Sequence, residues 1–142
     1  MKKIIICILS VFLVIICIVC YSIYQKNENI AQISTDNKVY ESYYNKEVLG
    51  TDIISLINKA TDSNEKNDVE VDKDGNYIEN DRNSIRVEIK FQELEKVITM
   101  ERINNIGIEK FWSNYGALSF KCTKIDYHEK THKVKYMYFE EI

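Results

Sequence analysis

The stretch IIICILSVFLVIICIVCYSIY, residues 4–24, contains no charged residue, no glycine and no proline. At a helical rise of about 1.5 Å per residue it extends over about 30 Å, the thickness of the hydrocarbon core of a bilayer. The pattern predicts one membrane-spanning helix in contact with lipid. We therefore expect residues 1–24 to form a cytoplasmic start and a transmembrane signal anchor.

Basic residues lie on one side of this stretch. Lys2 and Lys3 precede it, whereas Lys26 on the other side is soon offset by Glu28. Since cytoplasmic flanks of membrane helices are enriched in Lys and Arg, we expect the N-terminus in the cytoplasm and the C-terminal domain outside the cell membrane. The predicted protein is single-pass, with its lipid contact through residues 4–24.

Small residues near the end of the apolar run give two alternatives to a retained anchor. Residues 20–22 have the spacing of a signal peptidase site, but the run is longer than the usual signal-peptide core and cysteine matches the small-residue rule poorly. A lipid-modified Cys17 or Cys20 would need Gly or Ala before it, where Ile16 and Val19 stand. We expect the anchor to be retained.

The remainder of the chain, residues 25–142, is acidic. It holds all 22 Asp and Glu but only 17 of the 19 Lys and Arg, for a net charge of −5. Affinity for nucleic acid needs concentrated positive charge, so no nucleic-acid partner is expected. Cys122 is the one cysteine of this part, so no internal disulfide is expected, and the alternating segment around it favours a buried strand residue over a catalytic thiol.

Polar and then helical patterns follow the apolar run. Residues 25–37 are expected to form a juxtamembrane spacer or a fraying helix, and residues 38–142 an extracytoplasmic α+β domain. Asp36 can cap a helix that continues through about Val48, where Gly50 breaks it. The apolar side of this expected helix consists of Val39, Tyr40, Tyr43 and Tyr44.

A second helix is expected after the glycine. Thr51 or Asp52 can cap it, and its apolar positions recur at the spacing of one buried helical stripe. These positions are Leu49, Ile53, Leu56, Ile57 and Ala60. The polar run 61–68 is expected to be a loop.

Alternating segments in the second half of the chain predict strands. An Asp-Gly dipeptide within residues 69–79 favours a type I′ hairpin, and residues 84–91 alternate as a strand with one wet face. Residues 118–128 and 133–141 also alternate and should pair as an antiparallel hairpin.

Two further segments lie between these strands. Residues 92–106 fit a helix, through Leu94 and the apolar pair after it, or a short strand at 97–99. Gly107 and Gly116 bound a short helix. Its apolar stripe, expected in the core, consists of Ile108, Phe111, Trp112 and Tyr115. The predicted architecture is α+β, with an N-terminal transmembrane helix and two to three helices packed on an antiparallel sheet of four or five strands.

Residues 128–132, HEKTH, match the H-E-x-x-H signature of zinc metallopeptidases. In that motif a helix places two His on one face to bind zinc, and the Glu activates a water molecule. Here the five residues join two alternating segments, so we expect a solvated hairpin turn in which His128, Glu129 and His132 have no catalytic role. Adventitious zinc or nickel binding by the two His stays open.

Residues 72–76, DKDGN, have the composition of a calcium loop. An EF-hand loop that starts at Asp72 would need Gly at its sixth position and Glu at its twelfth, where Tyr77 and Asn83 stand. A glycine-containing turn is therefore expected. The sequence predicts no catalytic, cofactor-binding or metal residue.

The stretch YNKEVLGTDIISLINK, residues 44–59, together with residues 120–122 and 127–128, resembles small single-pass envelope proteins of low-GC Gram-positive bacteria, most of which have no known function. The resemblance spans most of the part after the apolar run and rests on cap and packing residues. It implies location and architecture and transfers no active site.

A hydrophobic helix that leads into a β-rich head is also similar to the plan of type IV pilins. Prepilins resemble one another in a Gly or Ala processing site and a Glu near the start of the helix. No Gly precedes Gly50 and no Glu precedes Glu28, so a processed pilin is not expected.

Three functions are compatible with these patterns. We expect a non-enzymatic, membrane-anchored head that binds another protein of the cell envelope, pilin-like or secretion-associated, because an aromatic-rich soluble part suits interfaces. The alternatives are a small zinc-dependent hydrolase that uses residues 128–132, and an anchored regulator that acts on a membrane complex through residues 4–24.

Overall fold

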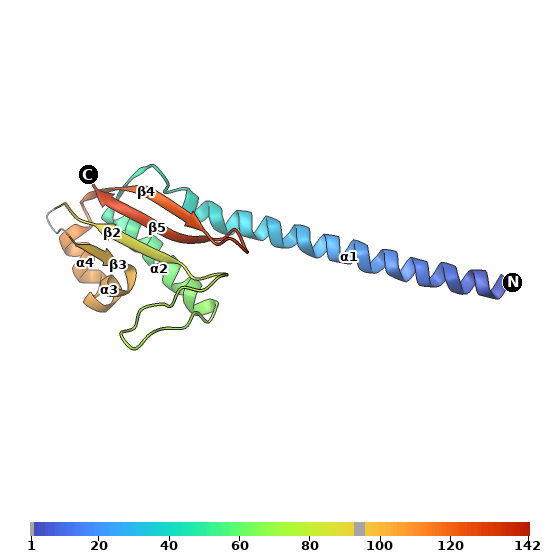
Figure 1. Cartoon of the computed structure of the whole chain (residues 1–142). Coiled ribbons are helices and arrows are strands. Elements are labelled where there is room, and N and C mark those ends of the chain that lie inside the picture. Colours follow the sequence, from blue (N-terminus) through green and yellow to red (C-terminus); the bar gives the residue numbers. More distant parts are fainter. Residues whose placement is uncertain (1, 93–95) are drawn as a thin grey trace. The chain divides into compact units, whose positions relative to one another are not determined.

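The computed structural model of the protein describes residues 2–92 and 96–142. The chain forms two compact units, Met1–Thr35 and Asp36–Ile142. The second unit, called the head below, contains a mixed sheet with helices, and the first consists of helix α1 up to Thr35 (Figure 1). The α+β class expected from the sequence is confirmed.

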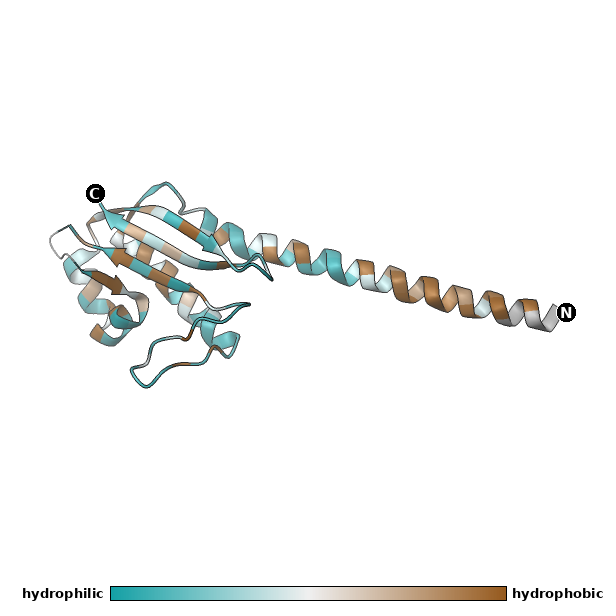
Figure 2. Ribbon diagram, in the orientation of Figure 1, coloured by the Kyte–Doolittle hydropathy of each residue, from teal (hydrophilic) through white to brown (hydrophobic). Residues whose placement is uncertain are grey.

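Helix α1 (Lys2–Glu41) contains the apolar run and is long and apolar enough to cross a membrane. Its most apolar 18-residue window has a mean hydropathy of 2.4, and none of that window is buried within the chain. Figure 2 shows the hydrophobic residues concentrated in the N-terminal part of α1. Because no protein core covers these side chains, they fit a lipid environment.

The helix expected between Asp36 and Val48 is not a separate element. Residues 25–41 continue α1 without a break, so the spacer expected at residues 25–37 is helical, and the chain turns after Glu41 into strand β1 (Glu47–Leu49). Within the head, side-chain bonds of Asn37 join the last turn of this helix to residues 132–134. Asn37 Nδ2 donates to the carbonyl oxygen of His132 at 2.7 Å, and Asn37 Oδ1 accepts from the backbone N–H of Val134 at 3.0 Å.

The described residues of the head form one sheet with the strand order β1-β4-β5-β2-β3. The other strands are β2 (Arg86–Lys90), β3 (Val97–Thr99), β4 (Ser119–Tyr127) and β5 (Val134–Glu141). The β4–β5 hairpin is antiparallel as expected, but β2 and β5 are parallel, so the sheet is mixed and not antiparallel. The alternation of buried and solvent-exposed residues along β2 shows which side of the strand faces the core. It does not show whether the neighbouring strand runs parallel or antiparallel.

Helices α2 (Gly50–Lys66), α3 (Met100–Ile106) and α4 (Ile108–Tyr115) cover one face of the sheet (Figure 1). The predicted stripe of α2 is buried from Ile53 to Ala60. Asp52 lies at the N-terminus of α2, where its carboxylate accepts a hydrogen bond from the backbone N–H of Leu49 at 3.2 Å. The expectation that Thr51 or Asp52 caps this helix is therefore wrong, because the N-cap is Leu49 and Asp52 is the third residue of the helix, from which its side chain reaches back to the cap.

The last turn of α2 replaces the loop expected at residues 61–68. The helix continues to Lys66 because the buried Asn64 ties it to the start of β2. Asn64 Nδ2 donates to the carbonyl oxygen of Ile85, and Asn64 Oδ1 accepts from the N–H of the same residue, both at 2.8 Å. Such a bond between distant residues leaves no periodic signal in the sequence.

An aromatic cluster forms one end of the core. The Phe91 ring contacts Phe120 edge-on with centroids 5.5 Å apart, and it also contacts Phe111 and Tyr115 on α4. The helix between the two glycines is thus confirmed, together with the core role of its Phe111. The sequence predicts Trp112 in the same stripe, but its side chain is 60% exposed, because α4 is short and buries only the side next to Phe91.

Residues 69–79 form a loop in which Val71 and Tyr77 make a single bridge. Gly75 has φ of 82°, whereas Asp74 does not have positive φ, so the type I′ turn is replaced by a three-residue turn with glycine in the left-handed position. For residues 92–106 the sequence left a helix and a short strand as alternatives. Residues 97–99 form strand β3, and helix α3 follows directly. Leu94 lies outside the described residues.

Candidate functional site

The HEKTH segment forms the turn between β4 and β5, as expected. The backbone N–H of His132 donates to the carbonyl oxygen of His128 at 2.9 Å, and His132 adopts a positive φ of 57°. A residue with this backbone conformation ends any helical geometry. The two His therefore do not share a helix face as the zinc motif requires.

The two imidazoles also lie in different surroundings. His128 is 3% exposed, and its Nε2 lies 2.8 Å from the carbonyl oxygen of Ser84. The His132 side chain is exposed, while its backbone oxygen accepts the bond from Asn37. Within residues 2–92 and 96–142, no three His, Cys, Asp or Glu side chains come together at a distance suited to a metal ion. The surroundings of the two imidazoles thus differ from those of the paired ligands in the zinc motif.

The turn at residues 128–132 is more than a solvated tip, because it closes over the loop 80–84. Lys130 forms an ion pair with Asp81, and Thr131 Oγ1 donates to the carbonyl oxygen of Arg82 at 2.6 Å. The hydrogen bond and the charge of Lys130 lower the pKa of Asp81. With His128 against Ser84, these contacts assign the turn a structural role that the sequence pattern alone did not reveal.

Asp72 organises the turn that resembled a calcium loop. Its Oδ1 accepts hydrogen bonds from the backbone N–H groups of Asp74 at 2.9 Å and Asn76 at 2.8 Å. Bonds from Asn76, first from its side chain, lower the pKa of Asp72. The carboxylate is therefore engaged in holding the turn, which confirms the interpretation of this segment as a glycine-containing turn.

Cys122 is fully buried in β4, as expected. Burial raises the pKa of its thiol to about 11, so the thiol is the dominant form at neutral pH. Since the thiolate is the nucleophile, this cysteine is poorly suited to catalysis.

The face of the sheet away from the helices contains a pocket of about 230 Å³ next to Tyr136. Tyr136 donates to Glu88 Oε2 at 2.7 Å, and Lys124 Nζ lies 5.2 Å from the centre of its ring. Burial and then the Glu88 hydrogen bond raise the pKa of Tyr136. The ion pair between Lys124 and Asp126, at 2.7 Å, neutralises charges inside the pocket.

A second pocket, of about 500 Å³, lies where α2, α3 and α4 meet. We call it the helix pocket. It is lined by Asn58, Thr61, Asp62, Asn104 and Ile108. Trp112, which is exposed, lies on α4 one helical turn after Ile108. Neither the helix pocket nor the exposure of Trp112 could be predicted from the sequence, because the periodicity of α4 indicates an apolar side without showing how much of that side the short helix buries.

Comparisons with protein-family models, with curated proteins and with solved structures found no match to this chain.

Proposed function

We propose that this protein is a single-pass membrane protein whose extracytoplasmic head binds another protein of the bacterial cell envelope and catalyses no reaction. The exposed indole of Trp112 carries the proposal, because aromatic side chains are enriched in protein interfaces relative to the rest of the surface. A pilin-like or secretion-associated assembly is the kind of process that such a module would serve.

The apolar part of α1 supports the location. Its exposed side chains require a lipid environment or a protein partner, and Lys2 and Lys3 before it favour a cytoplasmic N-terminus. This orientation puts the acidic C-terminal part outside the cell membrane. Retention of the segment as a signal anchor then keeps the head at the membrane surface.

The contact surface is the exposed side of the α3–α4 corner. We call Ile106, Ile108 and Trp112 the corner patch. Ile106 and Trp112 are exposed, and Ile108 is half-buried beside the helix pocket. A large aromatic anchor next to aliphatic side chains is the usual composition of an interface centre. By contrast, the tyrosine on the opposite sheet face already has its hydroxyl bonded to Glu88.

Two observations support binding over catalysis. The HEKTH segment holds the loop 80–84 through His128, Lys130 and Thr131, so its residues serve packing. Burial keeps the Cys122 thiol protonated at neutral pH. Two of the residues considered for chemistry, His128 and Cys122, are therefore buried and serve packing.

Site-specific photocrosslinking in intact cells tests the proposal. The full-length chain carries a benzoylphenylalanine at position 106, and a matched chain carries it at position 73, in the loop far along the sequence from the corner patch. We expect a discrete protein adduct from position 106 that falls at least several-fold when Trp112→Ala is added. Equal adducts from both positions, or no effect of Trp112→Ala, would refute the corner patch as the interface.

A further inference from the structure

Residues 36–41, at the C-terminal end of helix α1, belong to the compact unit of the head. We call them the α1 end. Two buried side chains hold this segment. Tyr40 packs in the hydrophobic core, and Asn37 bonds to residues of the β4–β5 turn (residues 128–133) and to the residue after it. The α1 end is therefore docked by one aromatic and one polar side chain.

Asn37 satisfies two backbone groups at the end of the β4–β5 turn. Its Nδ2 donates to the carbonyl oxygen of His132 at 2.7 Å, and its Oδ1 accepts from the N–H of Val134 at 3.0 Å. Val134 is 1% exposed, so removal of Asn37 would leave a buried N–H without this acceptor, which is costly. His132 also has a positive φ of 57°, which residues other than glycine rarely adopt. Asn37 therefore stabilises the conformation of the turn.

Side chains of the same turn contact loop 80–84 at three points. The side chains are those of His128, Lys130 and Thr131. Because a carbonyl oxygen can only accept, the His128 Nε2 atom that lies 2.8 Å from the Ser84 oxygen carries the hydrogen. Bonds within the loop, such as that from the N–H of Asn83 to Asn80 Oδ1 at 2.8 Å, fix its local shape. The contacts with the turn, together with the continuation of the chain into β2, set the position of the loop on the head.

Loop 80–84 ends beside the pocket next to Tyr136, on the face of the sheet away from the helices. Residues 84–86 line this pocket, and so does Lys135, the residue after Val134. The segments that Asn37 and the β4–β5 turn hold in place are thus part of the pocket wall or directly adjoin it in the chain. A displacement of the turn and the loop would therefore change the shape of this pocket.

We propose that the α1 end is a conformational switch of the head. When it is docked, Asn37 holds the β4–β5 turn and the turn holds loop 80–84; when Asn37 undocks, turn and loop open together as one cooperative unit. Both segments consist largely of exposed or half-buried residues, and such regions open at a lower free energy than the core. Because α1 continues without a break to the apolar run, docking at Asn37 is the step through which a change in that run would reach the pocket.

Hydrogen–deuterium exchange of the full-length protein in lipid nanodiscs, followed by mass spectrometry, tests the switch. We expect Asn37→Ala to speed exchange about tenfold in residues 128–134 and also in residues 80–84, since the loss of bonds to buried groups shifts a local opening equilibrium by about this factor. Exchange in α4 should not change. Tyr40→Phe is the matched control in the α1 end. It keeps the ring in the core and removes only the hydroxyl, which lies 3.4 Å from the carbonyl oxygen of Lys59, so exchange in residues 80–84 should stay the same.

A second set of variants tests whether the turn transmits the effect. Lys130→Met with Thr131→Val removes two of the contacts between turn and loop, so in this background the effect of Asn37→Ala on residues 80–84 should fall below about threefold, while its effect on residues 128–134 persists. A loop effect of full size in this background would overturn the proposal. Unchanged exchange in the loop after Asn37→Ala, or an equal increase in α4, would overturn it too. If Asn37→Ala does not fold, Asn37→Gln, which keeps the amide but moves it by one methylene group, is judged by the same criteria.

Discussion

At the scale of single residues, Asn64 joins two elements that are 21 positions apart in the sequence. Its amide pairs with both backbone groups of Ile85 inside the core, so it substitutes for the neighbouring strand that this end of β2 lacks. The same position in a sequence pattern is a polar residue in a polar run. For this reason the end of α2 could not be predicted from periodicity.

Asn64→Leu keeps a similar side-chain volume but leaves the N–H and C=O of Ile85 buried without partners. Each lost bond to a buried group costs about 1–3 kcal/mol, so we expect the free energy of unfolding to fall by about 2–4 kcal/mol. Urea unfolding of the full chain in nanodiscs, followed by near-UV circular dichroism, measures the change. Asn105→Leu on the exposed side of α3 is the control, with an expected change within about 0.5 kcal/mol.

The candidate site also shows what local patterns reveal. The alternating segments on both sides of residues 128–132 were sufficient to predict a turn and to reject a helical zinc motif. They could not show that the carbonyl of Ser84 lies against His128, because that contact joins residues 44 positions apart. The helix pocket likewise depends on three helices meeting, so no single segment indicated it.

At the scale of elements, strongly periodic segments were predicted well. The stripe of α2, the short α4 and the β4–β5 hairpin all carry their pattern in neighbouring residues. The errors arose where tertiary contacts decide. Asn37 bonds to the backbone of His132 and Val134, and α1 ends one turn later at Glu41. Val48 then pairs with Phe120 in β1 and does not continue a helix.

Gly50 is required by the close approach of α2 and α4. A Cβ atom at this position would lie 2.1 Å from the backbone oxygen of Tyr115, a contact that only a backbone shift can relieve. We expect Gly50→Ala to lower the free energy of unfolding by about 2–3 kcal/mol, as overpacking of a core does. The shift of the urea midpoint measures it.

Gly75 provides the matched comparison for this prediction. It has positive φ, but no atom lies within 4 Å of the place that a Cβ atom would occupy, and asparagine tolerates its conformation. Gly75→Asn should change the free energy of unfolding by less than about 1 kcal/mol. A loss at Gly75 as large as at Gly50 would show that conformation, and not close contact, governs both positions.

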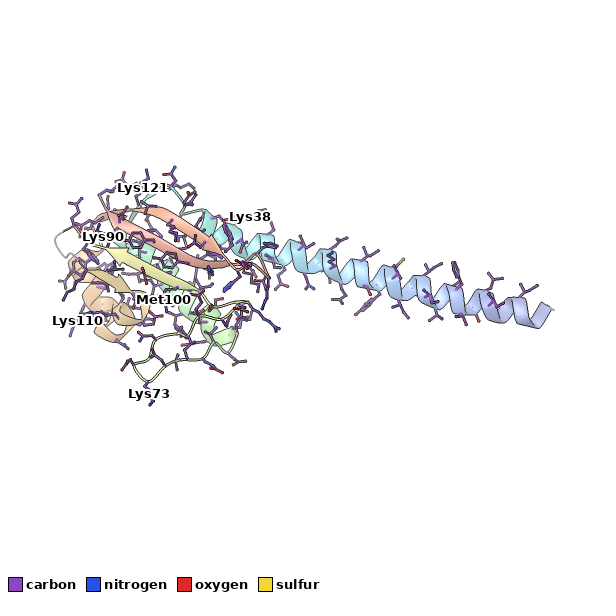
Figure 3. All side chains as sticks on the ribbon, in the orientation of Figure 1. Lys38, Lys73, Lys90, Met100, Lys110 and Lys121 are labelled. Atoms are coloured by element: carbon purple, nitrogen blue, oxygen red, sulfur yellow. The ribbon has the colours of Figure 1, made fainter. Side chains whose placement is uncertain are left out.

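At the scale of the whole molecule, membrane topology can be measured by labelling a single introduced cysteine. The native Cys122 can stay in place, because its buried thiol does not react in the folded protein. In a variant with Cys7, Cys17 and Cys20 replaced by alanine, we expect Lys73→Cys to react with a membrane-impermeant maleimide in intact cells. Lys73 projects from its loop (Figure 3). Cys122 should react only after denaturation, since it is fully buried.

Lys3→Cys in the same background is the control for orientation and should react only after the cells are lysed. Labelling of Lys3→Cys and protection of Lys73→Cys in intact cells would reverse the proposed orientation. A labelled protein that is shorter and leaves the membrane fraction would show cleavage of the apolar segment.

The attachment of Asn37 to the start of β5 also has a mechanical consequence. Tension applied to α1 would enter the head at the backbone of His132 and Val134, which Asn37 holds by two hydrogen bonds. Strand β5 is paired with β4 on one side and β2 on the other, so a load on β5 would be shared with both neighbours. The residues that line the helix pocket lie on α2, α3 and α4, outside this strand.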